Sequence, residues 1–268
     1  MSSTDTLITY EQRGDVAVVG LNRPDRRNAI NEEVVQALRT AVLRAHDQAR
    51  TAVIHGHGNN FSSGLDLKEC LDRLSNPPTG DFKRRRHSWH EVFDLIARGP
   101  IPWVAALHGA TIGGGLELAL ATHLRVGDET AFFGLPEGQR GIFVGGGGTV
   151  RVQRVIGFTV MADLMLTGRL LNAEEGERHQ IIRYRVAEGQ ALNKAIELAQ
   201  RIARNTLDTN WRIINVLPRV ADASHDDGLF IEQLTSAMYR PPEAASRLRD
   251  FLDGRSERLR APGEQAHG

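Results

Sequence analysis

The 268-residue chain lacks the features of several large classes of protein. It has a single cysteine, Cys70, which excludes a disulfide within the chain and a zinc site built from several cysteines. Lysine and arginine number 33 and aspartate and glutamate number 33, and this balance argues against a protein dedicated to nucleic acid. No stretch approaches the roughly 18 apolar residues of a membrane-spanning helix. We therefore expect neither nucleic acid nor membrane as a partner.

Signals for targeting and for metal binding are also scarce. The N-terminal segment is polar and lacks the apolar core of a secretory signal, which together with the single cysteine predicts a cytoplasmic protein. His87 and His90 would share a helix face, but no further ligand accompanies them, so no metal is expected. The basic run Lys83 to His87 is interpreted as a solvated surface or a subunit contact.

Strand and helix patterns alternate through most of the chain. Apolar runs predict strands at 15–21, 51–55 and 103–107. Helices are predicted after the N-cap Asn31 and over 88–98. From residue 191 onward only helical patterns remain, at 191–204, 210–220, 228–239 and 243–252. The sequence predicts the α/β class, with an α/β core over 1–195 and a helical region with a frayed tail over 196–268.

The 27 glycines gather in clusters, so phosphate-binding loops are the first function to test. A P-loop needs a Lys-Ser/Thr pair after its last glycine, and neither the cluster ending at Gly115 nor the one ending at Gly148 has it. A dinucleotide fingerprint needs a third glycine at the sixth position. Counting from Gly113 and Gly145, that position holds leucine and valine. Both nucleotide-binding interpretations are therefore disfavoured.

The glycines Gly113 to Gly115 directly precede a helical run that contains Glu117. Unhindered backbone N–H groups at a helix start suit a carbonyl oxygen that gains negative charge. A second glutamate, Glu137, follows a short predicted strand, and two carboxylates beside such a site would serve as acid and base. On spacing alone, the alternative is that Glu117 only caps its helix and Glu137 is a loop charge.

Taken together, five segments resemble those of the crotonase family, also called the enoyl-CoA hydratase/isomerase family, over most of residues 8–190. In order, they are Leu21 to Pro24 with Arg27 to Ala29, Phe61 to Leu67, Gly113 to Ala119, Phe133 to Glu137, and Met165 to Gly168. Each segment is weak alone, but their order and spacing make the resemblance specific. This resemblance makes a catalytic role for Glu117 far better supported than a role as a helix cap alone.

The resemblance implies a spiral of ββα repeats whose C-terminal helices drive trimerisation, with trimers often pairing into hexamers. It also implies an acyl-CoA substrate and no cofactor, because CoA is part of the substrate. Backbone N–H groups of Leu65 and Gly114 would form the oxyanion hole, and Glu117 and Glu137 would be catalytic. The other substrate-binding residues that it implies are Arg27, Ala29, Ser63, Gly64, Asp66, Leu67, Gly113, Pro136, Arg140 and Gly145.

Hydratases of this family keep both glutamates, whereas isomerases often keep only the later one and hydrolases often replace one or both. The resemblance therefore predicts an enoyl-CoA hydratase that adds water across the C2=C3 bond of a 2-enoyl-CoA. Other chemistry of the family stays open: double-bond isomerisation, thioester or C–C hydrolysis, retro-aldol cleavage, or acyl-CoA binding without catalysis.

A few positions depart from the family pattern. Gln139 and Arg140 follow the second glutamate where the family is usually apolar, Val144 replaces a common proline, and Gln180 stands where a glycine is usual. The polar pair suggests that Arg140 recognises a polar or carboxylated acyl group. The alternative is that Arg140 lies on the surface or in a subunit contact. For the basic run at 83–87, the resemblance adds a third interpretation, a contact to CoA phosphates.

Overall fold

The computed structural model describes residues 7–75, 88–238 and 243–255, so the basic run Lys83 to His87 lies outside the described residues. By its internal contacts the chain forms two units, Met1–Asn215 and Val216–Gly268. The expected boundary at residue 195 falls inside helix α7 (Ala191–Ala203), which packs on the sheet of the first unit. The division between the units falls inside α8 (Leu207–Ala221).

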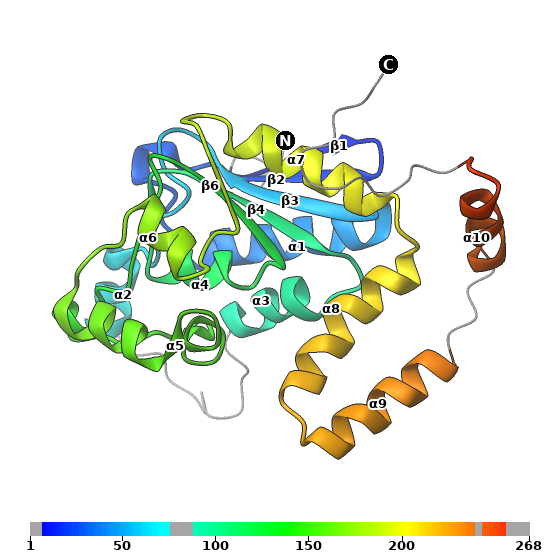
Figure 1. Cartoon of the computed structure of the whole chain (residues 1–268). Coiled ribbons are helices and arrows are strands. Elements are labelled where there is room, and N and C mark those ends of the chain that lie inside the picture. Colours follow the sequence, from blue (N-terminus) through cyan, green and yellow to red (C-terminus); the bar gives the residue numbers. More distant parts are fainter. Residues whose placement is uncertain (1–6, 76–87, 239–242, 256–268) are drawn as a thin grey trace. The chain divides into compact units, whose positions relative to one another are not determined.

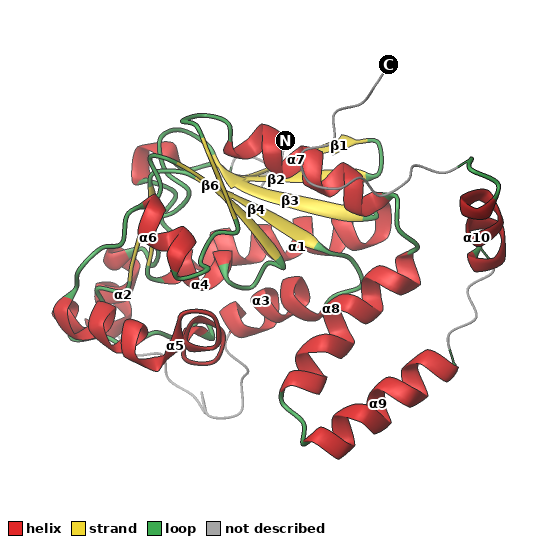
Figure 2. Cartoon of the chain, in the orientation of Figure 1, coloured by secondary structure: helices red, strands yellow, loops and turns green. Residues whose placement is uncertain are grey.

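The first unit is organised around a six-stranded sheet with the order β1-β2-β3-β4-β6-β8. Its strands are β1 (Ile8–Arg13), β2 (Val16–Leu21), β3 (Thr51–Gly56), β4 (Trp103–Leu107), β6 (Leu124–Asp128) and β8 (Tyr184–Val186). β1 pairs antiparallel with β2, and the other pairs of this sheet are parallel (Figure 2). A second, two-stranded parallel sheet joins β5 (Ala110–Ile112) to β7 (Phe132–Gly134).

Helices cover both faces of the main sheet, and successive side chains along each strand point to opposite faces. On β2, Val16 and Val18 pack in one cluster with residues of α7, while Ala17 and Val19 pack in the other. That second cluster includes the buried faces of α1 (Glu32–Gln48) and α3 (Ser88–Arg98), on the opposite side of the sheet from α7 (Figure 1). Burial on both faces explains why these strands read as continuous apolar runs.

The predicted elements in this part of the chain are confirmed closely. The helix over 88–98 and the strand over 103–107 have the predicted ends. Asn31 caps α1, its side chain accepting a hydrogen bond from the Val34 N–H at 3.0 Å. β1 has no counterpart among the predicted strands, because it is an edge strand whose polar residues are largely exposed.

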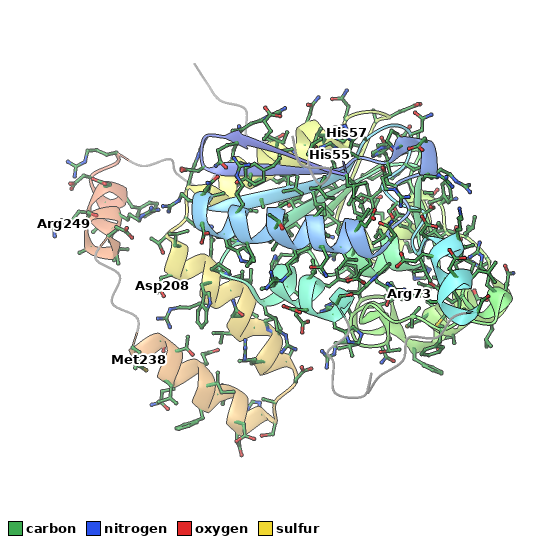
Figure 3. The ribbon with its side chains drawn as sticks, turned by 180° about the vertical axis from the view of Figure 1, so that it is seen from behind. His55, His57, Arg73, Asp208, Met238 and Arg249 are labelled. Carbon is green, nitrogen blue, oxygen red and sulfur yellow. The ribbon has the colours of Figure 1, made fainter. Side chains whose placement is uncertain are left out.

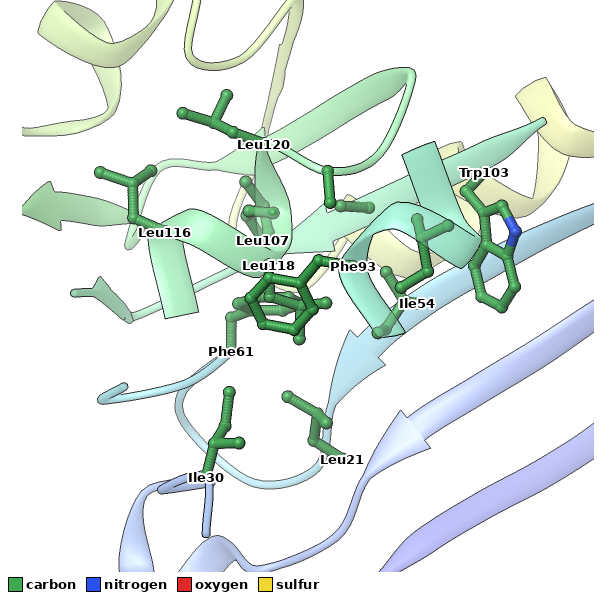
Figure 4. Packing of buried hydrophobic residues seen from close by; sticks show 14 of the residues in the cluster. Leu21, Ile30, Ile54, Phe61, Phe93, Trp103, Leu107, Leu116, Leu118 and Leu120 are labelled. Carbon is green, nitrogen blue, oxygen red and sulfur yellow. The ribbon is translucent and has the colours of Figure 1, made fainter. Parts of the chain in front are cut away.

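The remaining short elements of the first unit follow the carboxyl ends of the parallel strands. They are η2 (Pro24–Arg26) after β2, α2 (Leu67–Ser75) after β3, α4 (Gly114–Ala119) after β4 and β5, and η4 (Gly138–Arg140) after β7. Helices α5 (Gly148–Thr167) and α6 (Ala173–Arg178) come next. Leu118 of α4 lies beside Phe61 and Phe93 in the core (Figure 4), and Leu116 belongs to the same buried cluster. A buried core thus supports the element that carries Glu117.

The second unit contains the end of α8 together with α9 (His225–Ala237) and α10 (Ala244–Leu252). α9 begins three residues before its predicted start because Ser224 caps it, its side chain accepting from the Asp227 N–H at 3.2 Å. Within the described residues, no strand follows β8, as the sequence predicts. None of the described helices combines the length and the apolar character needed to cross a membrane.

Candidate active site

The segment from Ser62 to Asp66 is held between two other backbones. On one side the Ile30 N–H donates to the Gly64 carbonyl at 2.8 Å, and the Asp66 N–H donates to the Ile30 carbonyl at 2.9 Å. On the other side the Ser62 N–H donates to the Ala110 carbonyl at 2.9 Å. Because the Gly64 carbonyl and the Asp66 N–H both bond to Ile30, the N–H of Leu65 between them points away from Ile30.

Buried Asn28 locks the turn that carries Arg27 and Ala29. Its side-chain amide donates to the carbonyls of His57 and Asn60 at 2.9 and 2.7 Å, and its Oδ1 accepts from the Arg23 N–H at 2.8 Å. Arg27 and Asn28 both have positive φ, 51° and 52°, which costs energy for residues other than glycine. The hydrogen bonds of Asn28 hold this strained turn against the end of β3.

Glycines bring the Leu65 segment against the start of α4. The first side-chain carbon of any residue at position 64 would lie 2.5 Å from the Ile112 carbonyl oxygen and 2.9 Å from the Gly114 nitrogen. A side chain on Gly114 would overlap the ring of Trp89 and lie 3.6 Å from the Leu65 nitrogen. The N–H groups of Leu65 and Gly114 are therefore neighbours, and neither donates a hydrogen bond to another described residue.

Glu117 lies in the first turns of α4 and is only 3% exposed. Its Oε1 accepts hydrogen bonds from the N–H groups of Gly146 and Gly148 at 2.8 and 2.7 Å. Burial raises the pKa of Glu117, and the N–H groups of the glycine loop oppose that rise because they stabilise the anion. The carboxylate is thus bound by a distant loop and does not cap its own helix, whose N-cap is Gly113.

Glu137 follows β7 at the start of η4 and is 7% exposed. Burial, reinforced by the negative charge of Glu117, raises the pKa of Glu137 to about 7. Its Oε2 is buried and has no hydrogen-bond partner among the described residues. A side chain on Gly113 would come within 2.6 Å of its Oε1, and Gly113 also has a φ of 55°. Gly113 therefore leaves room for the Glu137 carboxyl.

The loop that binds Glu117 is itself anchored by an ion pair. Arg151, on α5, donates to the Gly146 carbonyl at 3.0 Å and pairs with Asp94 of α3. Both side chains are mostly buried, which strengthens the pair relative to one in water. Asp94 and Arg151 thus connect α3 and α5 to the backbone that holds Glu117.

Two neighbouring cavities, of about 590 and 260 Å³, share Leu65, Glu137 and Ile142 in their linings. Most of the residues expected to bind substrate line the larger one: Arg27, Ala29, Ser63, Asp66, Leu67, Gly113, Pro136 and Arg140. Gly114, Glu117 and Gly145 line the smaller one, and Gly64 lines neither because it packs against the backbone of Ile112 and Gly114. Both glutamates therefore face the smaller cavity.

Several lining residues are absent from the sequence-based expectation. Glu32, Glu69 and Arg73 line the smaller cavity, as does Trp89, whose helical spacing indicated a core or interface residue. No local motif marks them, because α1, α2 and α3 come together only in the fold. The described residues contain no group of three or more His, Cys, Asp or Glu side chains arranged to hold a metal ion.

A family model described as enoyl-CoA hydratase/isomerase matches residues 11–227. The chain belongs to this family. It is 35% identical over 209 residues to enoyl-CoA hydratase EchA19 of Mycobacterium tuberculosis, covering 76% of each chain. It is 34% identical over 252 residues to a putative enoyl-CoA hydratase of Thermus thermophilus, covering 92% of this chain and 98% of that one. It is also 33% identical to mouse mitochondrial methylglutaconyl-CoA hydratase, covering 84% of this chain and 70% of that protein.

Solved structures agree with this assignment. A putative enoyl-CoA hydratase from Rhodopseudomonas palustris superposes with a TM-score of 0.85 at 43% identity, covering 95% of this chain and 97% of that one. An enoyl-CoA hydratase subunit from Geobacillus kaustophilus has a TM-score of 0.84 at 27% identity, covering 95% and 98%. The predicted crotonase fold with C-terminal helices is thereby confirmed.

Proposed function

We propose that this enoyl-CoA hydratase/isomerase family member adds water across the C2=C3 bond of 2-enoyl-CoA thioesters. The observation that supports this most directly is the pair of buried glutamates facing one cavity, next to the N–H groups of Leu65 and Gly114. Attack of water at C3 moves electron density onto the thioester oxygen. Two backbone donors aimed at that oxygen stabilise the charge without reorganisation, which makes addition to C3 faster.

The two glutamates take different parts in this proposal. The glycine-loop amides favour the anion of Glu117, so it accepts a proton from water as the water oxygen bonds to C3. Glu137, whose pKa is about 7, holds a proton in the buried site and donates it to C2. One water is consumed per turnover, and proton exchange with solvent restores both carboxyl groups.

The larger cavity suits the phosphate-bearing part of CoA. Its lining includes the cationic side chains of Arg26, Arg27, Lys68 and Arg140, and guanidinium and ammonium groups are the usual partners of phosphate. Arg140 is among these bases and is absent from the lining of the smaller cavity. Its position supports a phosphate contact in preference to the acyl-carboxylate contact suggested by the sequence.

We also propose that the chain assembles into a trimer, or a pair of trimers, through its C-terminal helices. Support comes from the apolar side chains that the second unit exposes: Leu217, Leu229, Phe230, Leu234, Met238, Leu248, Phe251 and Leu252. Burial of such residues favours association. Light scattering on the purified chain tests this, and a monomer at micromolar concentration would contradict it.

The proposed reaction is tested with a panel of 2-enoyl-CoAs of increasing length, by the loss of conjugated enoyl-thioester absorbance. We expect hydration by the wild type and a loss of roughly 10²–10⁴-fold in Glu117→Gln and in Glu137→Gln, the range for general acid–base groups. Glu174→Gln, at an exposed position of α6, is the matched control and should keep full activity. Undiminished hydration in both site variants, or none in the wild type, would contradict the proposal.

A further inference from the structure

The smaller cavity is bounded on one side by charged groups that take no part in the proposed chemistry. Glu32 on α1 and Glu69 and Arg73 on α2 line it together. Arg73 lies on α2, drawn in cyan in Figure 3, and its guanidinium contacts Glu69 Oε1 at 2.5 Å and Glu32 Oε2 at 3.4 Å. Two carboxylates thus share one cation, so this wall carries a net negative charge.

The two carboxylates are held in place by neighbours besides Arg73. Glu69 Oε2 accepts from the Glu32 N–H at 3.0 Å, at the N-terminus of α1, where negative charge is favoured. Glu32 accepts from Ser88 at 2.9 Å and from Gln36 at 2.8 Å. Burial acts to raise the pKa of Glu32, but these hydrogen bonds and Arg73 outweigh it and lower that pKa, so Glu32 stays anionic at neutral pH.

The remainder of the cavity suits an uncharged acyl group. Trp89, Ile142, Phe143 and Val144 contribute apolar side chains to its lining, and Glu117 and Glu137 contribute two further acidic groups. Among its described lining residues Arg73 is the one cation, and it is already engaged by two carboxylates. An acyl carboxylate placed here would meet more negative than positive charge, with desolvation adding to the cost.

We propose that the smaller cavity selects acyl groups without a terminal charge and rejects those that end in a carboxylate, and that Glu32, Glu69 and Arg73 set this selection. The proposal rests on the proposed function for its assignment of the acyl group to this cavity. Under this proposal the protein differs in substrate class from its relative named for methylglutaconyl-CoA, because the acyl group of methylglutaconyl-CoA carries a carboxylate.

The test compares two thioesters that differ by a methyl group and a carboxylate at the same position, 2-pentenoyl-CoA and glutaconyl-CoA. We expect the wild type to hydrate the first with a kcat/KM at least 100-fold higher. Glu32→Gln and Glu69→Gln should each narrow that ratio by roughly tenfold, since each removes one negative charge near the tail. Arg73→Gln should widen it, and Glu174→Gln should leave it unchanged. Thermal melting confirms that each variant is folded.

A second measurement separates this proposal from the proposed reaction. Pentanoyl-CoA and glutaryl-CoA, the saturated counterparts, are titrated calorimetrically, so that selection is read without turnover. Tighter binding of pentanoyl-CoA supports the proposal even if no thioester is hydrated. Equal binding or hydration of both members of a pair would overturn it. So would a selective loss of the carboxylated ligand in Arg73→Gln, because Arg73 would then be an anchor for a carboxylate.

Discussion

Replacing Gly148 by alanine should lower the activity of this protein by displacing the carboxylate of Glu117. Gly148 is the first residue of α5, where alanine is a better helix former by up to about 1 kcal/mol. Its new methyl group, however, would lie 2.7 Å from Oε1 of Glu117, where the hydrogen bonds from the Gly146 and Gly148 amides now end. The carboxylate must move, and at least one of these bonds is lost or lengthened.

The size of the effect follows from that geometry. A hydrogen bond to a charged group contributes about 1.5–3 kcal/mol, so losing one should lower kcat/KM for a 2-enoyl-CoA by about 10- to 100-fold. Because the amides lower the pKa of Glu117, their loss raises it, and the limb of the pH–rate profile governed by Glu117 moves to higher pH.

The assay is a pH–rate profile together with a denaturant unfolding curve. Gly228→Ala, in α9, is the matched control, since its methyl group would meet only an ordinary contact of 3.4 Å with Val220. We expect Gly148→Ala to lose stability, because a hydrogen bond to the buried Glu117 carboxylate contributes more than the gain in helix propensity, and the control to keep both its stability and its activity. A Gly148→Ala enzyme with an unchanged rate and an unchanged pH profile would refute the conclusion that the glycine loop sets the state of Glu117.

Other variants test further features of the structure. Because the pKa of Glu137 is about 7 in the native state, against an ordinary 4.5, the stability that it contributes is present below about pH 4.5 and is lost as pH rises through 7. Glu137→Gln should therefore stabilise the protein by about 2–3 kcal/mol more at pH 8 than at pH 5 in urea unfolding. An equal change in stability at the two pH values would contradict the raised pKa of Glu137. Gln180 is exposed and has a φ of 62°, so Gln180→Gly should stabilise by about 0.5–1 kcal/mol in the same assay, and a loss of stability would contradict strain there. Arg151→Met should lower kcat/KM about tenfold and move the limb of the pH–rate profile that Glu117 governs to higher pH, and Arg151→Lys should restore part of the activity. Equal losses of activity in the two variants, without a shift of the pH–rate profile, would show that Arg151 acts only through its packing.

Local sequence was sufficient for the elements whose pattern is set by burial. The strand at 103–107 is apolar at every position, and the helix at 88–98 shows one apolar face, so both could be predicted with their ends. β1 was missed because an exposed edge strand has no such pattern. The departure at Gln180 was visible in the sequence, but its positive φ emerges only from the fold.

For the candidate site too, some features could be predicted from the sequence and others could not. Segments that carry a glycine cluster and a glutamate could be found by motif, and in the fold Glu117 and Glu137 line one cavity. The bonds from Gly146 and Gly148 to Glu117 span about thirty positions of sequence, and the Glu32–Arg73 contact joins two helices. Contacts of this kind depend on loop paths that no local pattern encodes, so their chemistry had to be found in the structure.

The two donors beside the glutamates are main-chain groups, and this affects how the site can change over generations. Exchange to proline is the one substitution that deletes the N–H of Leu65 or Gly114, and it would also disturb the backbone there, whereas several single base changes remove either carboxyl group. Mutation therefore removes the two carboxyl groups far more easily than the pair of N–H groups that would hold a thioester oxygen. A descendant of this chain with altered chemistry should differ first at positions 117 and 137, and a laboratory library aimed at new reactions on the same scaffold should begin there.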